Sequence, residues 1–390
     1  MNIGKHISPL LARQTDEEHR TATQLELLFD LVVVIAIAAS AHGLVGALED
    51  GHIGLGIVQF GIAFFVIWWP WNMFTWFATS FDNDDIAYRI NVMTMMVGIV
   101  FVAASLPRIF EGESLPSGFL GYVILRLAFA VLWLRVARAN PQYRVTALRY
   151  SLGQVCMQLL WAMIVFAIEP FGLTFYILFA LAALAELLIP WYAEKAANTP
   201  WHRHHLIERF GLLNIIVLGE VLLASTHALE ATFAEGFNIS ELTVAICGAI
   251  IAFAMWWLYF CEADHLTSIE VKQAFVWGYG HFLVFGSGAA VGAGLDVLVE
   301  AIAHSHGESE HLGTAAFSVS IPIAIYIIGL WIVRDRYMLK NLSRWLLPCF
   351  AILIALTGLL PYAPVPATFL LVNCLILRLR CERQLQHIQN

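Results

Sequence analysis

The chain has 390 residues, 60% of them hydrophobic and only 13% charged, and its formal net charge is −8. Soluble domains contain about 25% charged residues, so this composition excludes a soluble protein and predicts a polytopic integral membrane protein. The 21 lysines and arginines are too scattered to form a basic surface, and we therefore expect no nucleic-acid partner.

The first residues are polar and unlike a cleavable signal peptide, so we expect a cytoplasmic N-terminal segment at 1–24. Apolar runs follow, each close to the roughly 20 residues that cross a bilayer as a helix. In chain order the predicted spans are 25–48, 54–77, 88–106, 118–138, 145–168, 172–190, 206–229, 240–262, 273–299, 314–335, 343–361 and 364–380. The predicted fold is all-α, with about twelve transmembrane helices.

The positive charges predict the orientation of these helices. If every run spans the membrane, nearly all lysines and arginines fall on the side that holds the N-terminus. Short cytoplasmic loops carry an excess of Lys and Arg. We therefore expect both termini in the cytoplasm.

Two pairs of similar segments predict an internal duplication. The sequence ASAHGL at 39–44 is similar to ASTHAL at 224–229, and FVIWW at 65–69 is similar to FAMWW at 253–257. Two six-helix repeats would share one orientation, while chance similarity between apolar segments is the alternative. The predicted organisation is a first repeat at 25–190, a cytoplasmic linker at 191–205, a second repeat at 206–380 and a cytoplasmic tail at 381–390.

Several motifs are distinctive in their order. They are Arg20 with ELLFDLV at 26–32, WWPW at 68–71, FDNDD at 81–85 with Arg89, AASLP at 103–107, HLIERFGL at 205–212 and LGE at 218–220. Together they resemble the bacterial low temperature requirement protein A (LtrA) family. The resemblance implies a multi-pass protein of the bacterial plasma membrane, linked by name to growth in the cold, with no settled transport substrate or reaction.

Acidic and imidazole groups in apolar runs are the main functional candidates, because charges in hydrocarbon are costly. Glu26 and Asp30 share one helix face, which suits a cation or proton site. The alternatives are partners for Arg or Trp groups on neighbouring helices, or a capping role. Glu220 and His227 also share a face and could exchange protons, or Glu220 could make a structural hydrogen bond; His42 is the repeat counterpart of His227.

A second group of candidates lies near the start of the seventh run. His205, Glu208 and Arg209 cluster there, and Glu208 joins the proton or cation candidates. His205 and Glu208 are three residues apart and could bind a metal together with His202 and His204, but the order is not that of a zinc protease. We favour a basic collar and expect no metal and no cofactor.

Other polar residues are structural or gating candidates: Asp82, Asp84, Asp85, Arg89, Arg126, Glu186, Arg209 and His281. We expect the aspartates to pair with Arg89 or to cap the third helix, and Glu186 to be a partner for Arg126. We expect the glycines at 286–294 to let helices approach closely. The histidines and glutamates at 304–311 form a solvated loop in this interpretation, with weak metal capture as the alternative.

Twelve spans, a parallel duplication and buried acids favour a transporter or ion conduit with a proton- or cation-linked site between the two repeats. A membrane-embedded enzyme acting on lipid or another apolar substrate is an alternative, but no catalytic motif supports it and we expect no enzyme. A structural or sensory membrane protein is the other alternative. The expected partners are the lipid bilayer, a small ion or small-molecule substrate, and a second copy of the chain.

Overall fold

The computed structural model describes residues 8–14, 17, 20–113, 115–234, 238–262, 266, 270–304, 309–360 and 362–389. Within these ranges every regular element is helical. The long helices are α1 (Gln24–Glu49), α2 (Ile53–Ser80), α3 (Ile86–Phe110), α4 (Pro116–Ala139), α5 (Arg144–Ala167), α6 (Leu173–Glu194), α7 (Arg203–Ala234), α8 (Ile239–Phe260), α9 (Val271–His304), α10 (Ser309–Leu330), α12 (Leu346–Leu356) and α13 (Pro364–Gln389). The short elements are η1 (Pro141–Tyr143), η2 (Trp331–Asp335), α11 (Arg336–Met338), η3 (Asn341–Trp345) and η4 (Thr357–Leu359).

In the described part of the chain, eleven helical segments are long and apolar enough to cross a membrane. This confirms the polytopic all-α fold, and the length and apolar composition of these helices suit a lipid bilayer. The predicted span 206–229 lies within α7, which is helical over 32 residues but is not one of the eleven. Its N-terminal turns carry the charged and imidazole groups of the HLIERF motif.

Two predicted spans are less regular than expected. The run 314–335 ends in the π-helical turn η2, and the run 343–361 divides into η3, α12 and η4. At the α12–η4 junction, Gly358 lies against the ring of Phe317 and the hydroxyl of Ser320. A hydrophobic run does not reveal such local changes of helix type, because its apolar composition is the same in an α-helix and in a 3₁₀ or π turn.

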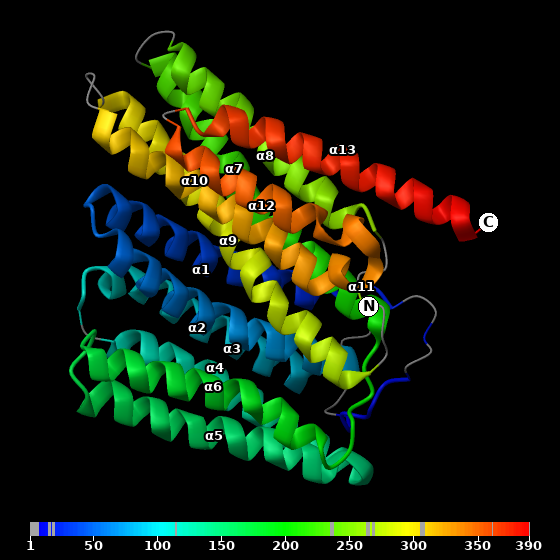
Figure 1. The fold of residues 1–390 in the computed structure, drawn as a ribbon. Helices are drawn as coiled ribbons and strands as arrows, with labels where there is room; N and C mark the ends of the chain where they lie inside the picture. The colour runs from blue at the N-terminus through cyan, green and yellow to red at the C-terminus, as the bar shows by residue number, and fades with distance from the viewer. Residues whose placement is uncertain are drawn as a thin grey trace. The chain divides into compact units, whose positions relative to one another are not determined.

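The chain divides into two compact units, with unit 1 formed by 1–40 and 59–209 and unit 2 by 41–58 and 210–390. The division after residue 209 lies close to residue 206, where the predicted second repeat begins. Residues 41–58, in contrast, lie in the predicted first repeat but belong to unit 2. In unit 1, α3 packs on α4, α4 on α5 and α5 on α6, as Figure 1 shows. Gly98 and Gly121 face each other where α3 and α4 meet, and a methyl group on either would meet the other's carbonyl oxygen.

Unit 2 is built around α9 and α10, which pack along much of their length, with α12 on α10 and α13 on α8 (Figure 1). The predicted glycine-rich stretch forms the close contacts. Gly288 faces Val217, Gly292 lies against the backbone of Glu220, and Gly294 lies against the backbone of Ser318. The packing role predicted for these glycines is confirmed, and the internal repeat stays a prediction.

Candidate functional site

The first turn of α1 carries both acidic candidates. The hydroxyl of Thr23 accepts a hydrogen bond from the backbone N–H of Glu26 (3.3 Å), and the Glu26 carboxylate accepts one from the backbone N–H of Thr23 (2.7 Å). This reciprocal pair is a capping box, which satisfies backbone donors that a helix cannot satisfy internally. Asp30 lies one turn further on, on the same face. Glu26 thus has the capping role that was one of the alternatives to a cation or proton site.

Arg209 of α7 contacts both acids. Its guanidinium nitrogens lie 2.8 Å from Oε1 of Glu26 and 2.6 Å from Oδ1 of Asp30. The indole N–H of Trp71 donates to the same Asp30 oxygen at 2.7 Å. The exposed fractions of Glu26, Asp30 and Arg209 are 1%, 0% and 0%. Two buried negative charges therefore share one positive charge, and buried ions are stable only when they are compensated.

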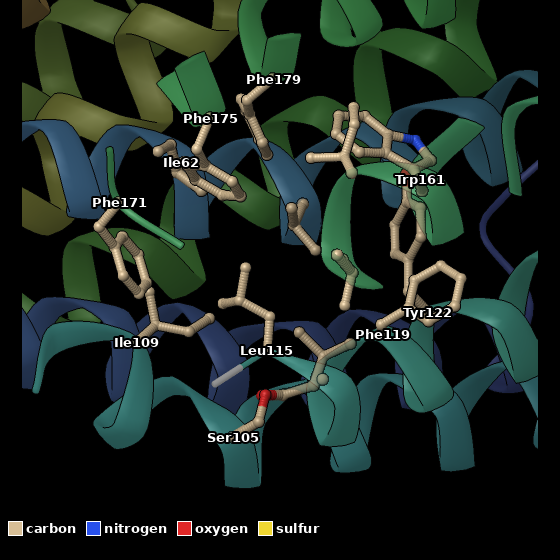
Figure 2. Close-up of a pocket in the computed structure, with 15 residues that line it drawn as sticks. Ile62, Ser105, Ile109, Leu115, Phe119, Tyr122, Trp161, Phe171, Phe175 and Phe179 are labelled. Atoms are coloured by element: carbon tan, nitrogen blue, oxygen red, sulfur yellow. The ribbon is translucent and has the colours of Figure 1, made fainter. Parts of the chain in front are cut away.

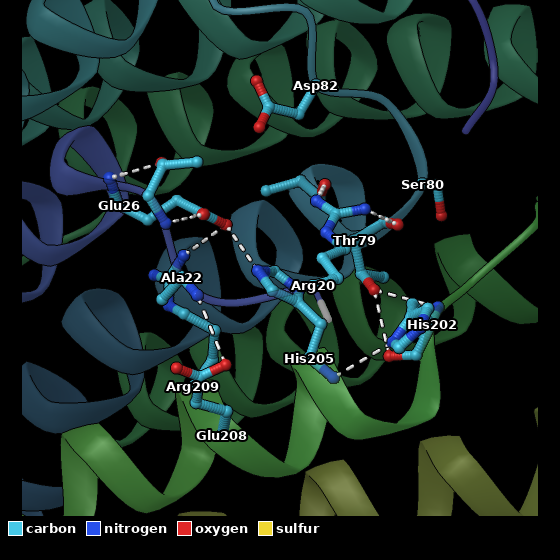
Figure 3. A network of polar contacts seen from close by, with 12 residues as sticks. Arg20, Ala22, Glu26, Thr79, Ser80, Asp82, His202, His205, Glu208 and Arg209 are labelled. Atoms are coloured by element: carbon cyan, nitrogen blue, oxygen red, sulfur yellow. Dashed lines mark hydrogen bonds and ion pairs between the residues drawn. The ribbon is translucent and has the colours of Figure 1, made fainter. Parts of the chain in front are cut away.

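His205 provides the other cationic group that this cluster can acquire (Figure 3). Its Nε2 lies 3.1 Å from Oε1 of Glu26, one helical turn before Arg209, and the imidazole is fully buried. A proton on His205 would balance the second carboxylate. Glu208 lies beside this cluster, where its carboxylate accepts a hydrogen bond from the backbone N–H of Ala22 at 3.3 Å.

Arg20 and Asp82 extend the cluster at the end of α2. Arg20 donates to the backbone carbonyls of Ala78 and Thr79, where the last turn of a helix carries partial negative charge. Asp82 follows α2, outside the membrane-spanning segments. Burial raises the pKa of Asp82 to about 6, and the negative charge of Glu26 acts in the same direction, against the weaker effect of Arg20.

We expect Asp82→Asn to stabilise the protein above pH 6. The ordinary pKa of this carboxyl is 3.8, so between about pH 4 and pH 6 the unfolded chain loses its proton while the folded chain keeps it. The free energy of unfolding of the natural protein then falls by up to about 3 kcal/mol as the pH rises. Thermal midpoints in detergent from pH 4 to pH 8 should coincide near pH 4 and diverge above pH 6. A constant difference at all pH values would contradict this, and the exposed Glu111→Gln is the control.

In the segment between α2 and α3, Asp84 and Asp85 have the roles predicted for them, whereas Asp82 contacts Arg13 at 3.5 Å instead of Arg89 or the start of α3. Asp84 forms an ion pair with Arg89 at 2.5 Å, and Asp85 caps α3 by accepting a hydrogen bond from the backbone N–H of Tyr88 at 2.7 Å. Asp85 also binds Arg135 of α4 at 2.6 Å. Burial acts to raise the pKa of Asp85, but these bonds outweigh it and lower that pKa.

The predicted partnership of Arg126 and Glu186 is confirmed. The guanidinium of Arg126 on α4 lies 2.5 Å from Oε2 of Glu186 on α6, and both side chains have an exposed fraction of 0%. The indole N–H groups of Trp69 and Trp161 also donate to this carboxylate, at 2.9 and 3.1 Å. Glu186 is thus a common acceptor for side chains from three other helices.

In unit 2 the candidates have other partners than expected. His227 contacts Oδ1 of Asp296 on α9 at 3.0 Å, not the predicted Glu220, which is half-buried on its own helix. A spacing of seven residues leaves two side chains about 10 Å apart along a helix, which is too far for a direct bond. His42 is exposed. His281 is buried, and its ring nitrogens lie 2.8 Å from the carbonyl of Trp277 and 3.1 Å from the Tyr259 hydroxyl.

Sequence reasoning missed a buried ion network at the end of α10. Asp335 contacts Arg334 at 2.5 Å and Arg378 of α13 at 2.9 Å, and the three side chains have exposed fractions of 0–1%. The available signal was an Asp beside an Arg within the predicted span 314–335, together with an Arg within 364–380. Charged residues at the ends of spans are usually solvated, so their positions alone do not indicate a buried network.

The described residues contain no group of three His, Cys, Asp or Glu side chains arranged to hold a metal. His205 and Glu208 have separate partners, Glu26 and Ala22. His306 and Glu308 of the predicted histidine-rich loop lie outside the described residues, as do the side chains of its other members.

Comparisons with known proteins support the resemblance seen in the motifs. The family described as Bacterial low temperature requirement A protein (LtrA) matches residues 21–379. An uncharacterized protein of Rhizobium meliloti (strain 1021) is 23% identical over 346 residues, which is 83% of this chain and 79% of the relative. No solved structure matches the chain. Because the match covers nearly the whole chain, including the buried acids and Arg209, the chain belongs to the bacterial LtrA family.

Proposed function

We propose that this LtrA protein is a transporter or ion conduit in which Glu26, Asp30, His205 and Arg209 form a proton- and cation-responsive site. The observation that carries the proposal is the second carboxylate oxygen of Asp30. Oδ2 is buried and has no hydrogen-bond partner among the described residues. A buried acceptor of this kind is costly unless something binds it.

The charges of the cluster define what could bind. With neutral His205, two carboxylates and one guanidinium leave one excess negative charge. A proton on His205 or a small monovalent cation beside Asp30 would each remove that excess, so the two compete. All four residues belong to unit 1, and we propose that they bind a cation or a proton without catalysing a reaction. We place both termini in the cytoplasm of the bacterial cell, following the distribution of positive charge.

Flux through purified protein in proteoliposomes tests this function. We expect K⁺ or Na⁺ flux that falls only as the pH falls below about 6.5, because burial lowers the pKa of His205 from its ordinary value of 6.5 and a proton occupies the site only below that value. A unit charge about 4 Å from a cation contributes on the order of 1–4 kcal/mol, so Asp30→Asn should lower the flux by about tenfold or more. The exposed Asp84→Asn should leave the flux unchanged.

The variants must elute as monodisperse protein with unchanged helical content for the comparison to hold. Absence of K⁺, Na⁺ and proton flux in the natural protein would exclude the conduit and favour a structural or sensory role. Equal flux through Asp30→Asn and the natural protein would show that the excess charge of this cluster has no part in transport.

A further inference from the structure

The helix pair α5 and α6 of unit 1 has an exposed apolar face that ends in positive charge. The two helices pack on each other, and both expose large apolar side chains, among them Leu148 and Leu152 on α5 and Leu188 on α6. In a membrane protein, exposed side chains of this kind contact lipid. Three cations lie where α5 begins and α6 ends, and we call them the cationic end: Arg144, Arg149 and Lys195.

Contacts between the two helices hold Arg149 in place. Its Nη1 donates to the backbone carbonyl of Tyr192 at 3.0 Å, and its guanidinium carbon lies 4.5 Å from the centre of the Tyr192 ring. One turn earlier on α5, the Thr146 hydroxyl donates to the carbonyl of Ala197 at 2.8 Å and accepts from the N–H of Ala197 at 3.1 Å. Lys195 lies between Tyr192 and Ala197 in the chain, so it is about one helical turn from the residue that Arg149 contacts.

The cationic end has no acidic partner in the described part of the chain. Residues 131–160 contain no Asp or Glu. The acid at the end of α6, Glu194, is buried, and its carboxylate accepts from the Tyr150 hydroxyl at 2.9 Å and from the hydroxyl and backbone N–H of Thr199 at 2.8 and 2.6 Å. The cationic end therefore presents positive charge that no carboxylate of these helices balances.

The opposite end of the same two helices has no such charge. Residues 160–181 contain no Lys or Arg. An apolar pocket lies at that end, and Figure 2 shows the rings of Trp161, Phe171, Phe175 and Phe179 at its walls. The lipid-facing side of this helix pair is thus cationic in one leaflet only.

We propose that the cationic end binds the headgroup of an anionic phospholipid, whose acyl chains lie along the exposed apolar side chains of α5 and α6. The Tyr192 carbonyl takes one of the five N–H donors of Arg149, which leaves others for phosphate oxygens. A water-soluble anion would meet the same cations but would gain nothing from the apolar face beside them. None of these residues belongs to the cluster around Asp30, so the inference is independent of the proposed function.

A fluorophore on α5 can report which lipid occupies this face. Cys156 is exposed and lies seven residues from Arg149, about 10 Å along the same helix. Bimane is attached to it in full-length protein whose other accessible cysteines, Cys261, Cys349 and Cys381, are changed to serine. The protein is reconstituted into phosphatidylcholine bilayers that contain increasing fractions of phosphatidylglycerol with brominated acyl chains, which quench bimane on contact. Brominated phosphatidylcholine is the neutral comparison.

We expect stronger quenching by brominated phosphatidylglycerol than by brominated phosphatidylcholine at the same mole fraction. Each basic residue near a lipid surface favours anionic lipid by about fivefold. Arg149→Gln and Lys195→Gln should therefore each lower the preference for phosphatidylglycerol about fivefold and leave quenching by brominated phosphatidylcholine unchanged. Tyr192→Leu keeps all three charges but removes the ring beside Arg149, so it should lower the preference by about two- to fivefold.

Arg108→Gln is the matched control, because it removes one exposed positive charge near the far end of α3, outside the cationic end. It should leave the preference unchanged, and excess inorganic phosphate should not displace the brominated lipid. Equal quenching by the two lipids in the natural protein, or an equal loss of preference in Arg108→Gln, would overturn the proposal. Displacement by inorganic phosphate would also overturn it and identify a water-soluble anion as the ligand.

Discussion

Arg126→Met is expected to lower the free energy of unfolding by about 3–5 kcal/mol. The methionine fills much of the space of the arginine but leaves the Glu186 carboxylate buried with only the indole donors of Trp69 and Trp161. A buried charge that loses its counter-ion keeps its full desolvation cost. Thermal or denaturant unfolding in detergent, followed by helical content, should show the loss as a much lower midpoint and a poor yield of monodisperse protein.

The ion pair of Arg89 and Asp84 is a natural control, because it has the same separation of 2.5 Å but side chains that are 48% and 50% exposed. Ion pairs between exposed side chains contribute little to stability, so Arg89→Met should change the unfolding midpoint little. The double variant Arg126→Met, Glu186→Met should recover much of the lost stability, since it removes both charges. A double variant no more stable than Arg126→Met would show that the pair is not the cause.

Asp335→Leu is the second change for which we expect a large effect, also about 3–5 kcal/mol. It removes the anion shared by Arg334 and Arg378, so that Arg334 loses its ion pair while Arg378 keeps only its longer contact with Glu262 at 3.5 Å. Arg334 keeps its bonds to the backbone carbonyls of Leu258 and Tyr259, which limits the damage but cannot neutralise its charge.

The conservative variant separates charge from shape. Asp335→Asn keeps an acceptor oxygen and nearly the same volume, so its loss of stability should be smaller than that of Asp335→Leu but still clear in the same unfolding measurement. If Asp335→Asn unfolds like the natural protein, hydrogen bonding rather than charge holds η2 against α13, and the electrostatic account is wrong.

Composition and motif order predicted the fold class and the family, because long apolar runs in this chain have few alternatives to a membrane-spanning helix. They also predicted Arg126 with Glu186, since an arginine inside a span must find an anion. The capping function of Glu26 was only one alternative, although Thr23 three residues before it is the residue type that forms a capping box.

The sequence could not supply the rest. The sequence indicated that Glu26, Asp30 and Arg209 are candidate residues. It could not show that they meet, because the residue pattern of one helix does not specify which other helix packs against it. For the same reason it paired His227 with Glu220, when the true partner, Asp296, lies on α9. The sequence also could not predict the apolar pocket lined by Trp161 and Phe179, because its lining residues come from five helices and each of those helices has the composition of an ordinary apolar span.

One carboxylate in unit 1 has two structural duties. The same Glu26 side chain that closes the first turn of α1 through Thr23 also contacts Arg209 and His205. Replacing this one side chain would therefore loosen the start of a 26-residue helix and leave the buried Arg209 with one carboxylate fewer.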